Sequence, residues 1–230
     1  MRRDDPDVYL VDEPEPPTVT APPAVVHRAL APQVTPARLA RMEAVAAART
    51  RDVVVVLDGL TDPHNTSAVL RSADAFGVQE VHVVVGAQPF RAAHRVARGT
   101  HLWLDIVRHR TAEACAQALH ARGFTILVAT MGGEKRPEDL PALERVAIVF
   151  GNEHAGVSPA LRSRADGTYA ISMVGFVESL NVSVAAAITL HAATRGRAPL
   201  PEEDRTALVA RWLLRTVRDG PALVARNLSY

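Results

Sequence analysis

Polar side chains that could bind or orient a substrate gather where an apolar segment of the chain leads into a helix. Residues 171–190 begin with an apolar strand end, turn at Gly175 and continue as a helix of small apolar residues. The first turn of this helix is unusually polar and contains Glu178, Ser179, Asn181 and Ser183. Capping of unpaired helix N–H groups is the simpler role for such residues. Beside a glycine turn that lets another molecule approach, they could also form a binding site.

Two earlier segments also place polar residues directly after an apolar strand. These segments, residues 62–77 and 148–158, contain His64, Asn65, Arg71, Gly151 and Glu153. An asparagine amide can donate and accept hydrogen bonds, whereas an ionised glutamate only accepts. Their structural alternatives are helix capping for Asn65 and a solvated loop carboxylate for Glu153. His64 is the one histidine that could serve as a base, although a structural hydrogen bond is the commoner role of a loop histidine.

The elements around these segments indicate an α/β fold with a mostly parallel sheet flanked by helices. Continuous β-branched runs, typical of strands buried on both faces, predict strands at residues 53–57, 81–85, 125–129, 146–150 and 169–172. Helical patterns lie between them, at residues 66–76 and 111–122, and a long helix starts at Ser179. Open sheets of this kind bind ligands at the carboxyl ends of their strands, where these polar loops lie.

The two ends of the chain differ from this core. Residues 1–34 are rich in proline and acidic side chains, and this composition predicts a disordered tail. Thr35 followed by Pro36 predicts an N-cap and the first residue of a helix. We therefore expect one domain over residues 35–198, including this N-terminal helix, and a C-terminal helical extension over residues 199–230.

The charge balance limits how the protein could bind nucleic acid. The formal net charge is only +1, so RNA binding would need a local basic patch. The arginines expected to contact RNA phosphates are Arg91, Arg95, Arg98 and Arg211. A solvated basic face is the alternative.

Cysteine and hydropathy patterns exclude several classes of protein. Cys115 is the only cysteine, so no intrachain disulfide can form, and its Ala-rich surroundings predict a buried small residue. No Cys-x-x-Cys or His-x-x-His spacing suggests a metal, and no apolar run is long enough to span a membrane. No apolar signal segment follows the first residues, and a reducing cytoplasm fits these features.

Taken in order and at these separations, the three segments resemble the signature motifs of the SpoU branch of the SPOUT RNA methyltransferases. The resemblance covers residues 35–195 and, through His64–Asn65, Arg71 and residues 74–77, is strongest to the TrmH group. It implies transfer of a methyl group from S-adenosylmethionine to a ribose 2′-oxygen of tRNA, at guanosine 18 of the D-loop. It also implies a homodimer and a deep C-terminal trefoil knot. The chain has no room for the separate N-terminal RNA-binding domain of relatives that modify ribosomal RNA, which favours tRNA.

The resemblance also implies roles for individual residues. The catalytic residues would be Asn65 and Arg71 of the first motif, Glu153 of the second, and Ser179 and Asn181 of the third. The cofactor would be bound by Thr130, Met131, Gly132, Gly151, Ile171, Met173, Ser179 and Leu180. Asn152 and His154 occupy a variable part of the second motif.

Arg71 is expected to hold a phosphate beside the target ribose rather than to act as a base, because a guanidinium stays protonated in proteins. An ion pair with Asp74, three residues later on the same helix, is the structural alternative.

Other activities remain as alternatives. The chain could methylate another tRNA position or ribosomal RNA, or could be an inactive RNA-binding module, although every motif residue is present. A nucleotide-binding oxidoreductase is disfavoured because no Gly-x-Gly-x-x-Gly follows the first strand.

Overall fold

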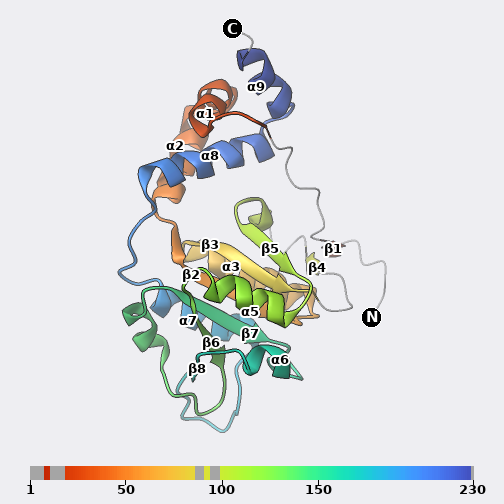
Figure 1. Cartoon of the computed structure of the whole chain (residues 1–230), viewed down its shortest axis with the longest axis vertical. Helices are drawn as coiled ribbons and strands as arrows, with labels where there is room; N and C mark the ends of the chain where they lie inside the picture. Colours follow the sequence, from red (N-terminus) through yellow and green to blue (C-terminus); the bar gives the residue numbers. More distant parts are fainter. Residues whose placement is uncertain (1–7, 11–18, 86–90, 94–98, 229–230) are drawn as a thin grey trace. The chain divides into compact units, whose positions relative to one another are not determined.

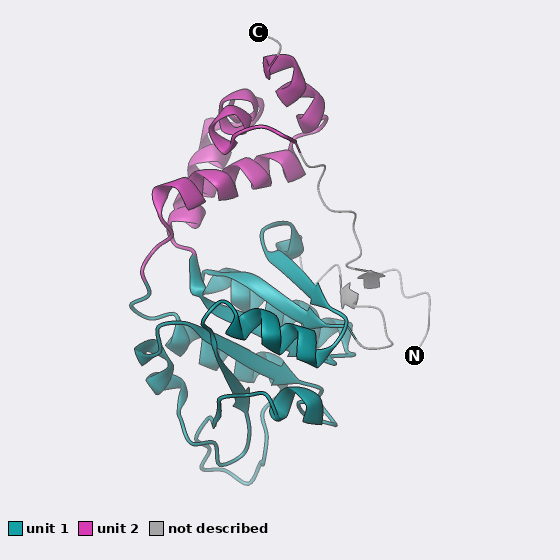
Figure 2. Cartoon of the chain, viewed as in Figure 1, with its two compact units in different colours: residues 1–11, 50–197 teal, residues 12–49, 198–230 magenta. Residues whose placement is uncertain are grey.

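The computed structural model describes residues 8–10, 19–85, 91–93 and 99–228, and for residues 8–10 and 91–93 it describes the backbone only. The chain forms two compact units, shown in different colours in Figure 2. Unit 1 comprises residues 1–11 and 50–197, and unit 2 comprises residues 12–49 and 198–230.

Unit 1 is built on a six-stranded sheet in which every paired strand is parallel to its neighbours (Figure 1). The strand order is β5-β3-β2-β7-β6-β8. The strands are β2 (Thr50–Asp58), β3 (Val78–Val84), β5 (Asp105–His109), β6 (Thr125–Ala129), β7 (Val146–Gly151) and β8 (Gly167–Tyr169). The helices are α3 (Pro63–Ala75), α5 (Ala112–His120), α6 (Pro159–Arg162) and α7 (Val182–Ala193), with 3₁₀ turns η2 (Thr100–Leu102) and η3 (Pro137–Ala142). The predicted parallel α/β sheet is confirmed.

The sheet is covered by helices on both faces because its central strands are apolar on both sides. On β2, Val53, Val55 and Leu57 pack in one cluster with residues of α3 and α7. Val54 and Val56 pack in the other cluster, with residues of α5 and α6. Successive side chains of a strand point to opposite faces, so the continuous valine run of β2 supplies both layers.

The order of the strands reverses at the neighbouring strands β2 and β7. From β2 the chain proceeds through β3 to the edge strand β5, and then crosses to β6, on the far side of β7. The register pairs Asp58 with Gly151, so β2 and β7 end at the same level of the sheet. Such a reversal point, at the carboxyl ends of the strands, is where α/β sheets bind ligands.

The segment between β8 and α7 differs from the sequence prediction. β8 ends at Tyr169 rather than continuing to residue 172, because only residues 167–169 pair with β6. Helix α7 begins at Val182, with Asn181 as its N-cap, and not at Ser179. Glu178 and Ser179 therefore precede the helix instead of forming its first turn. The trefoil knot stays a prediction.

The loop after β6 is tied closely to the end of β8. The backbone N–H groups of Thr130 and Lys135 donate to the carbonyls of Tyr169 and Thr168, at 3.0 and 3.1 Å. A Cβ atom added to Gly133 would lie 2.3 Å from the carbonyl carbon of Tyr169. Only glycine permits this approach, so residues 130–135 and 168–170 are held against each other by backbone contact.

Unit 2 is a group of helices from both ends of the sequence: α1 (Pro23–Leu30), α2 (Pro36–Ala47), α8 (Glu202–Thr216) and α9 (Gly220–Leu228), with the 3₁₀ turn η1 (Ala31–Gln33). Trp212 of α8 is 1% exposed, and the guanidinium carbon of Arg49 lies 5.7 Å from its ring centroid. The side chain of Thr35 caps α2 as expected, accepting from the backbone N–H of Arg38 at 3.2 Å.

Two expectations about the ends of the chain are wrong. Residues 23–33 are helical, although their proline content predicted disorder, because Val26, Ala29 and Leu30 of α1 are buried. Helix α2, which the sequence placed with the sheet domain, belongs to unit 2.

A few further features complete the fold. The backbones of β1 (Val8–Leu10) and β4 (Arg91–Ala93) pair antiparallel. Cys115 is fully buried as predicted, and burial together with the charge of Asp58 raises the pKa of its thiol to about 12. No helix in the described part of the chain has the length and apolar character to cross a membrane.

We predict that Gly133→Ala will destabilise unit 1, because the added methyl group would overlap the backbone of Tyr169. Overpacking of this kind costs about 1–3 kcal/mol. Thermal unfolding followed by circular dichroism should show a lowered midpoint. Gly175→Ala is the matched control, because nothing lies within 4 Å of its added Cβ. Equal midpoints for both variants would contradict the predicted contact.

Candidate functional site

The three polar segments meet in one chain of side-chain hydrogen bonds. Asn65 Nδ2 donates to Glu153 Oε1 at 2.9 Å, and Asn181 Nδ2 donates to Asn65 Oδ1 at 3.0 Å. Asn181 Oδ1 accepts from the hydroxyl of Ser183 at 2.6 Å. Asn65 is 88 positions from Glu153 and 116 positions from Asn181 in the sequence. The hydrogen bonds therefore join the start of α3, the loop after β7 and the start of α7. Every donor in this chain points toward Glu153.

Asn65 is available for this role because another residue caps its helix. Asp62 is the N-cap of α3, and its Oδ1 accepts from the backbone N–H of His64 at 2.8 Å. The capping alternative for Asn65 is therefore wrong. Its amide orientation follows from its partners, since an ionised Glu153 can only accept and so requires the NH₂ group of Asn65 to face it.

Asn181 has both of the roles that the sequence left open. Its Oδ1 accepts from the backbone N–H of Ser183 at 2.8 Å, which makes it the cap of α7. Its Nδ2 is directed to Asn65. Capping fixes the amide at the helix start, and this fixed amide in turn holds Asn65.

The loop after β7 is a tight turn that presents Glu153. Asn152 and Gly156 exchange backbone hydrogen bonds of 3.0 and 2.8 Å. A Cβ atom on Gly151 would lie 2.3 Å from backbone atoms of Gly156 and Val157, so only glycine fits there. The close contacts of Gly151 are therefore with residues of its own loop.

Asn152 organises this turn and ties it to the first motif. Its Oδ1 accepts from the backbone N–H groups of His154 and Ala155 at 2.9 and 3.0 Å. Its Nδ2 donates to the carbonyl of Gly59, just beyond the end of β2, at 2.9 Å. The sequence interpretation treated Asn152 as a variable position, and its spacing two residues before His154 was the available signal of a local turn.

A second tie between the two loops comes from Asp58, which the sequence interpretation missed. Asp58 is 5% exposed at the end of β2, and its Oδ2 accepts from the backbone N–H of Ser158 at 2.7 Å. An acidic residue that directly ends an apolar strand run was the available signal, because a buried carboxylate needs a hydrogen-bond donor.

Arg71, Ser179 and the imidazole of His64 do not join the chain of hydrogen bonds. All three residues are exposed. Within the described residues, no hydrogen bond or ion pair is recorded for the side chains of Arg71, Ser179 or His64, so the predicted alternative pair between Arg71 and Asp74 is not formed.

The predicted cofactor residues surround an open loop. Residues 171–180 make no recorded hydrogen bond with the described part of the chain. Apolar side chains here are exposed, including Met131 at 74% and Met173 at 37%. Backbone N–H and C=O groups beside apolar side chains can bind a heterocycle such as adenine.

The predicted RNA-binding residues are only partly described. Arg95, Arg98 and the side chain of Arg91 lie outside the described residues. Arg211 is on α8 of unit 2 and is partly buried. Its role in RNA binding therefore stays a prediction.

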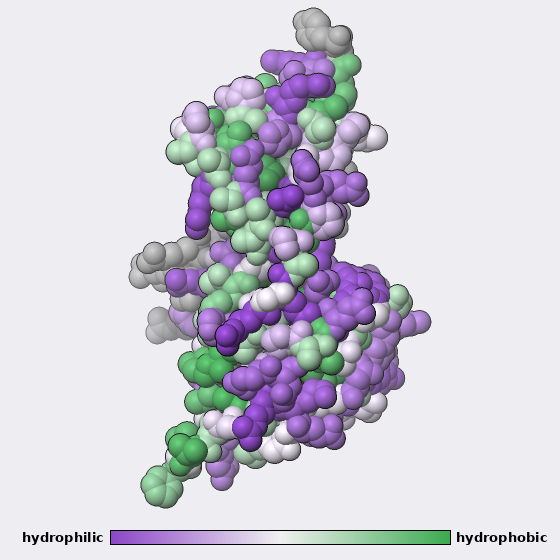
Figure 3. Space-filling model, turned by 90° about the vertical axis from the view of Figure 1, so that its left-hand side faces the viewer, coloured by the Kyte–Doolittle hydropathy of each residue, from purple (hydrophilic) through white to green (hydrophobic). Residues whose placement is uncertain are grey.

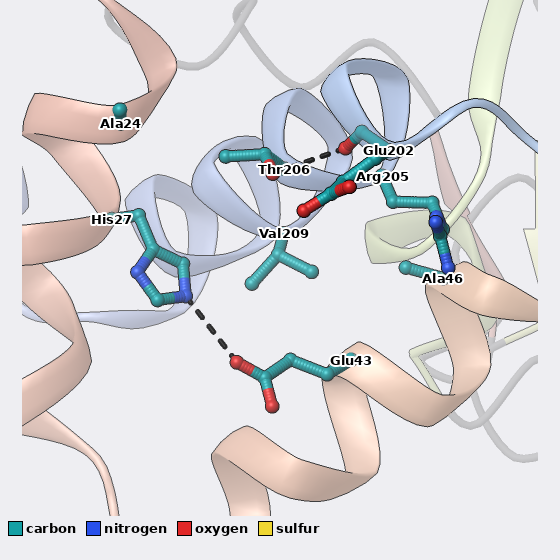
Figure 4. A pocket seen from close by; sticks show the side chains of 8 residues that line it. All are labelled: Ala24, His27, Glu43, Ala46, Glu202, Arg205, Thr206 and Val209. Carbon is teal, nitrogen blue, oxygen red and sulfur yellow. Dashed lines mark hydrogen bonds and ion pairs between the residues drawn. The ribbon is translucent and has the colours of Figure 1, made fainter.

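Unit 2 contains a pocket of its own (Figure 4). His27 and Glu43 face each other across it, with His27 Nε2 3.5 Å from Glu43 Oε1. It is lined by Ala24, His27, Glu43, Ala46, Glu202, Arg205, Thr206 and Val209. None of the three motifs contributes to this lining, so the hydrogen-bonded chain in unit 1 remains the candidate site.

Comparison with known proteins identifies the class. The sequence profile of the SpoU rRNA Methylase family matches residues 52–191, which include all three motifs. The chain belongs to this family.

Within this family, the chain is similar to individual proteins that are named as tRNA-modifying enzymes. The chain is 37% identical over 175 residues to a tRNA (guanosine(18)-2′-O)-methyltransferase of Thermus thermophilus, covering 76% of this chain and 90% of the relative. It is 34% identical to the Escherichia coli protein of the same name, covering 71% and 72%. The crystal structure of the Aquifex aeolicus TrmH/SpoU tRNA modifying enzyme superposes with a TM-score of 0.71 at 30% identity, covering 79% of this chain and 98% of that one.

We predict that Asn152→Ala will loosen the turn that presents Glu153. The variant loses the hydrogen bonds to His154, Ala155 and Gly59, each worth about 0.5–1.5 kcal/mol. Amide hydrogen exchange in residues 151–157 should accelerate, while exchange in the core strands should not change. His154→Ala is the control, because only the backbone of His154 takes part in the turn. Unchanged exchange in the Asn152→Ala variant would show that backbone pairing alone holds the loop.

Proposed function

We propose that this protein transfers the methyl group of S-adenosylmethionine to the ribose 2′-hydroxyl of guanosine 18 in tRNA. The main support is the hydrogen-bonded chain Ser183–Asn181–Asn65–Glu153, which joins all three family motifs at the carboxyl end of the sheet. The relatives of Thermus thermophilus and Escherichia coli are named for this reaction.

The described residues fit the proposed cofactor. Backbone hydrogen bonds hold residues 130–135 against the end of β8, and residues 171–180 beside them make no hydrogen bond with the described part of the chain. A solved structure of the family member AviRb from Streptomyces viridochromogenes, 28% identical with a TM-score of 0.57, is a complex with AdoMet. The proposed binding residues are Thr130, Met131, Gly132, Gly151, Ile171, Met173, Ser179 and Leu180, and the threading of these loops would form the trefoil knot.

The proposed reaction is an in-line displacement, for which S-adenosylmethionine supplies an electrophilic methyl group on a sulfonium. The protein must hold the ribose oxygen in line and help its proton to leave. Glu153 and Asn65 contribute fixed acceptor and donor groups, since Asn181 holds Asn65 and the turn around Asn152 holds Glu153. Ser179, exposed next to this chain in sequence, is available to contact the nucleotide.

Arg71 is proposed to bind the phosphate next to the target ribose. Its guanidinium has no recorded partner among the described residues, and its planar fork suits two phosphate oxygens. A positive charge at this position would lower the pKa of the 2′-hydroxyl. The proton would leave to the phosphate or to water, because the guanidinium itself cannot accept it.

A homodimer is the proposed assembly. Val174, Phe176 and Val177 are 106%, 108% and 63% exposed in the loop before α7, and Val184 and Ile188 of α7 are 46% and 40% exposed. Figure 3 shows hydrophobic residues, in green, gathered at the lower left of the view and at its lower tip. Exposed apolar side chains that gather in this way are typical of protein–protein interfaces.

We predict that purified protein will transfer label from S-adenosylmethionine to unmodified tRNA, with the methyl group mapped to the ribose of guanosine 18. A tRNA carrying a 2′-deoxyguanosine at this position should accept no label, because the attacking hydroxyl is missing. Ribosomal RNA is tested as the alternative substrate, because one relative, 36% identical over 157 residues, is named a 23S rRNA (guanosine-2′-O-)-methyltransferase, from Coxiella burnetii. Equal labelling of the deoxy-substituted tRNA would refute guanosine 18 as the target, and labelling of ribosomal RNA alone would refute the tRNA assignment.

We predict that Arg71→Lys will lower the turnover number by roughly 100-fold, the usual effect of a small misplacement of reacting groups. Lysine keeps the charge but loses the fork. Equilibrium binding of S-adenosylmethionine should persist, and Arg71→Ala should be less active still. Arg195→Lys is the control, because Arg195 is exposed beyond the opposite end of α7. Near-normal turnover of Arg71→Lys would show that charge alone suffices, and full activity of Arg71→Ala would remove Arg71 from the catalytic residues.

A further inference from the structure

A buried polar cluster lies on the α5 side of the sheet, apart from the three motifs. Glu80 and His82 are two residues apart on β3 and are 4% and 1% exposed. His109 ends β5, and Cys115, fully buried, lies in α5. The surrounding layer is apolar and includes residues such as Val56 and Ala116. Polar groups in such a layer need specific partners.

Three atoms of this cluster have the chemistry and spacing of metal ligands. One ring nitrogen of His82, one of His109 and the sulfur of Cys115 lie within 4.8 Å of one another. A tetrahedral zinc ion with Zn–N of about 2.1 Å and Zn–S of about 2.3 Å needs ligand atoms roughly 3.3–3.6 Å apart. The three ligand atoms therefore require only small movements to surround one ion.

The two imidazoles already face each other through the atoms that a metal would bind. His82 Nδ1 and His109 Nε2 are 2.7 Å apart, and their ring planes differ by 7°. This distance is a hydrogen bond, so one proton lies between the two nitrogens. A metal ion would replace this proton and push the nitrogens apart by roughly 0.7 Å.

The second nitrogen of His82 has the partner expected of a metal ligand. His82 Nε2 lies 2.6 Å from Glu80 Oε1. Arg122 donates to both oxygens of this carboxylate, and Arg51 Nη1 lies 3.5 Å from its Oε2. Glu80 therefore holds the proton of His82 on Nε2 and leaves Nδ1 as an acceptor. Metal-binding histidines commonly have such a carboxylate in the outer shell.

We propose that His82, His109 and Cys115 bind one zinc ion, with a water molecule as the fourth ligand. Two imidazoles and a thiolate suit zinc better than magnesium or calcium, which prefer oxygen. The ion would join the edge strand β5 and helix α5 to β3, and would stabilise unit 1. A buried pair of hydrogen-bonded histidines beside a core cysteine is the alternative, and it predicts no metal binding.

The test uses the full chain without a histidine tag, freed of metal with a chelator. Cobalt(II) is titrated as a spectroscopic probe and then displaced by zinc. We expect one cobalt ion per chain, a near-ultraviolet thiolate-to-cobalt charge-transfer band and the visible spectrum of a four-coordinate ion. Zinc should abolish both signals and raise the unfolding temperature.

Two variants and one control make the outcome decisive. Cys115→Ala, a small change in an apolar layer, should fold with a similar circular dichroism spectrum and lose the charge-transfer band. Glu80→Gln should weaken zinc binding by roughly 10–100-fold. His120→Ala, which removes an exposed histidine of the same helix, should bind zinc as the parent does. Absence of one-to-one binding, or binding that survives Cys115→Ala or depends on His120, would overturn the proposal.

Discussion

The parallel pairing of β2 with β7 is the constraint on which the candidate site depends. Their register sets Asp58 opposite Gly151, so the first two motif loops leave the sheet side by side. Two hydrogen bonds also fix the loops to each other. The backbone N–H of Ser158 donates to the carboxylate of Asp58, and the side chain of Asn152 donates to the carbonyl of Gly59. These contacts involve backbone groups, so they set the positions of the loops independently of Asn65 and Glu153. The bond between Asn65 and Glu153 follows from this arrangement.

The sheet was predictable from sequence because parallel strands buried on both faces are continuous β-branched runs, as in residues 53–57. The start of α7 was not predictable, because Glu178, Ser179, Asn181 and Ser183 offer several polar residues for one cap. Asn181 is the residue that both caps the helix and donates a hydrogen bond to Asn65, which is distant in the sequence. Helix α1 was missed for a similar reason: burial of Val26 and Leu30 outweighs the local effect of the prolines.

The sequence indicated which residue types could form the site but not how they meet. The motifs identified Asn65, Glu153 and Asn181. Their order in one chain of hydrogen bonds depends on how distant segments pack, which the sequence does not show. Asp58 and Asn152 were missed because local signals indicate only a buried carboxylate and a turn, whereas their partners are backbone groups of distant segments. The histidine–cysteine cluster was missed because its three members lie on three elements, and His82 and His109 are separated by 27 positions.

Neutral amides, and not a cation, hold the hydrogen-bonded chain at the site together. Glu153 accepts from the neutral amide of Asn65, which is itself held by Asn181, and no recorded ion pair joins Glu153 to a cation among the described residues. The carboxylate is thus positioned without the use of a guanidinium. An arginine paired with Glu153 would give up its affinity for phosphate, because the same fork binds carboxylate and phosphate. In the proposed reaction, amides would fix Glu153, and the charge of Arg71 would be left for an RNA phosphate.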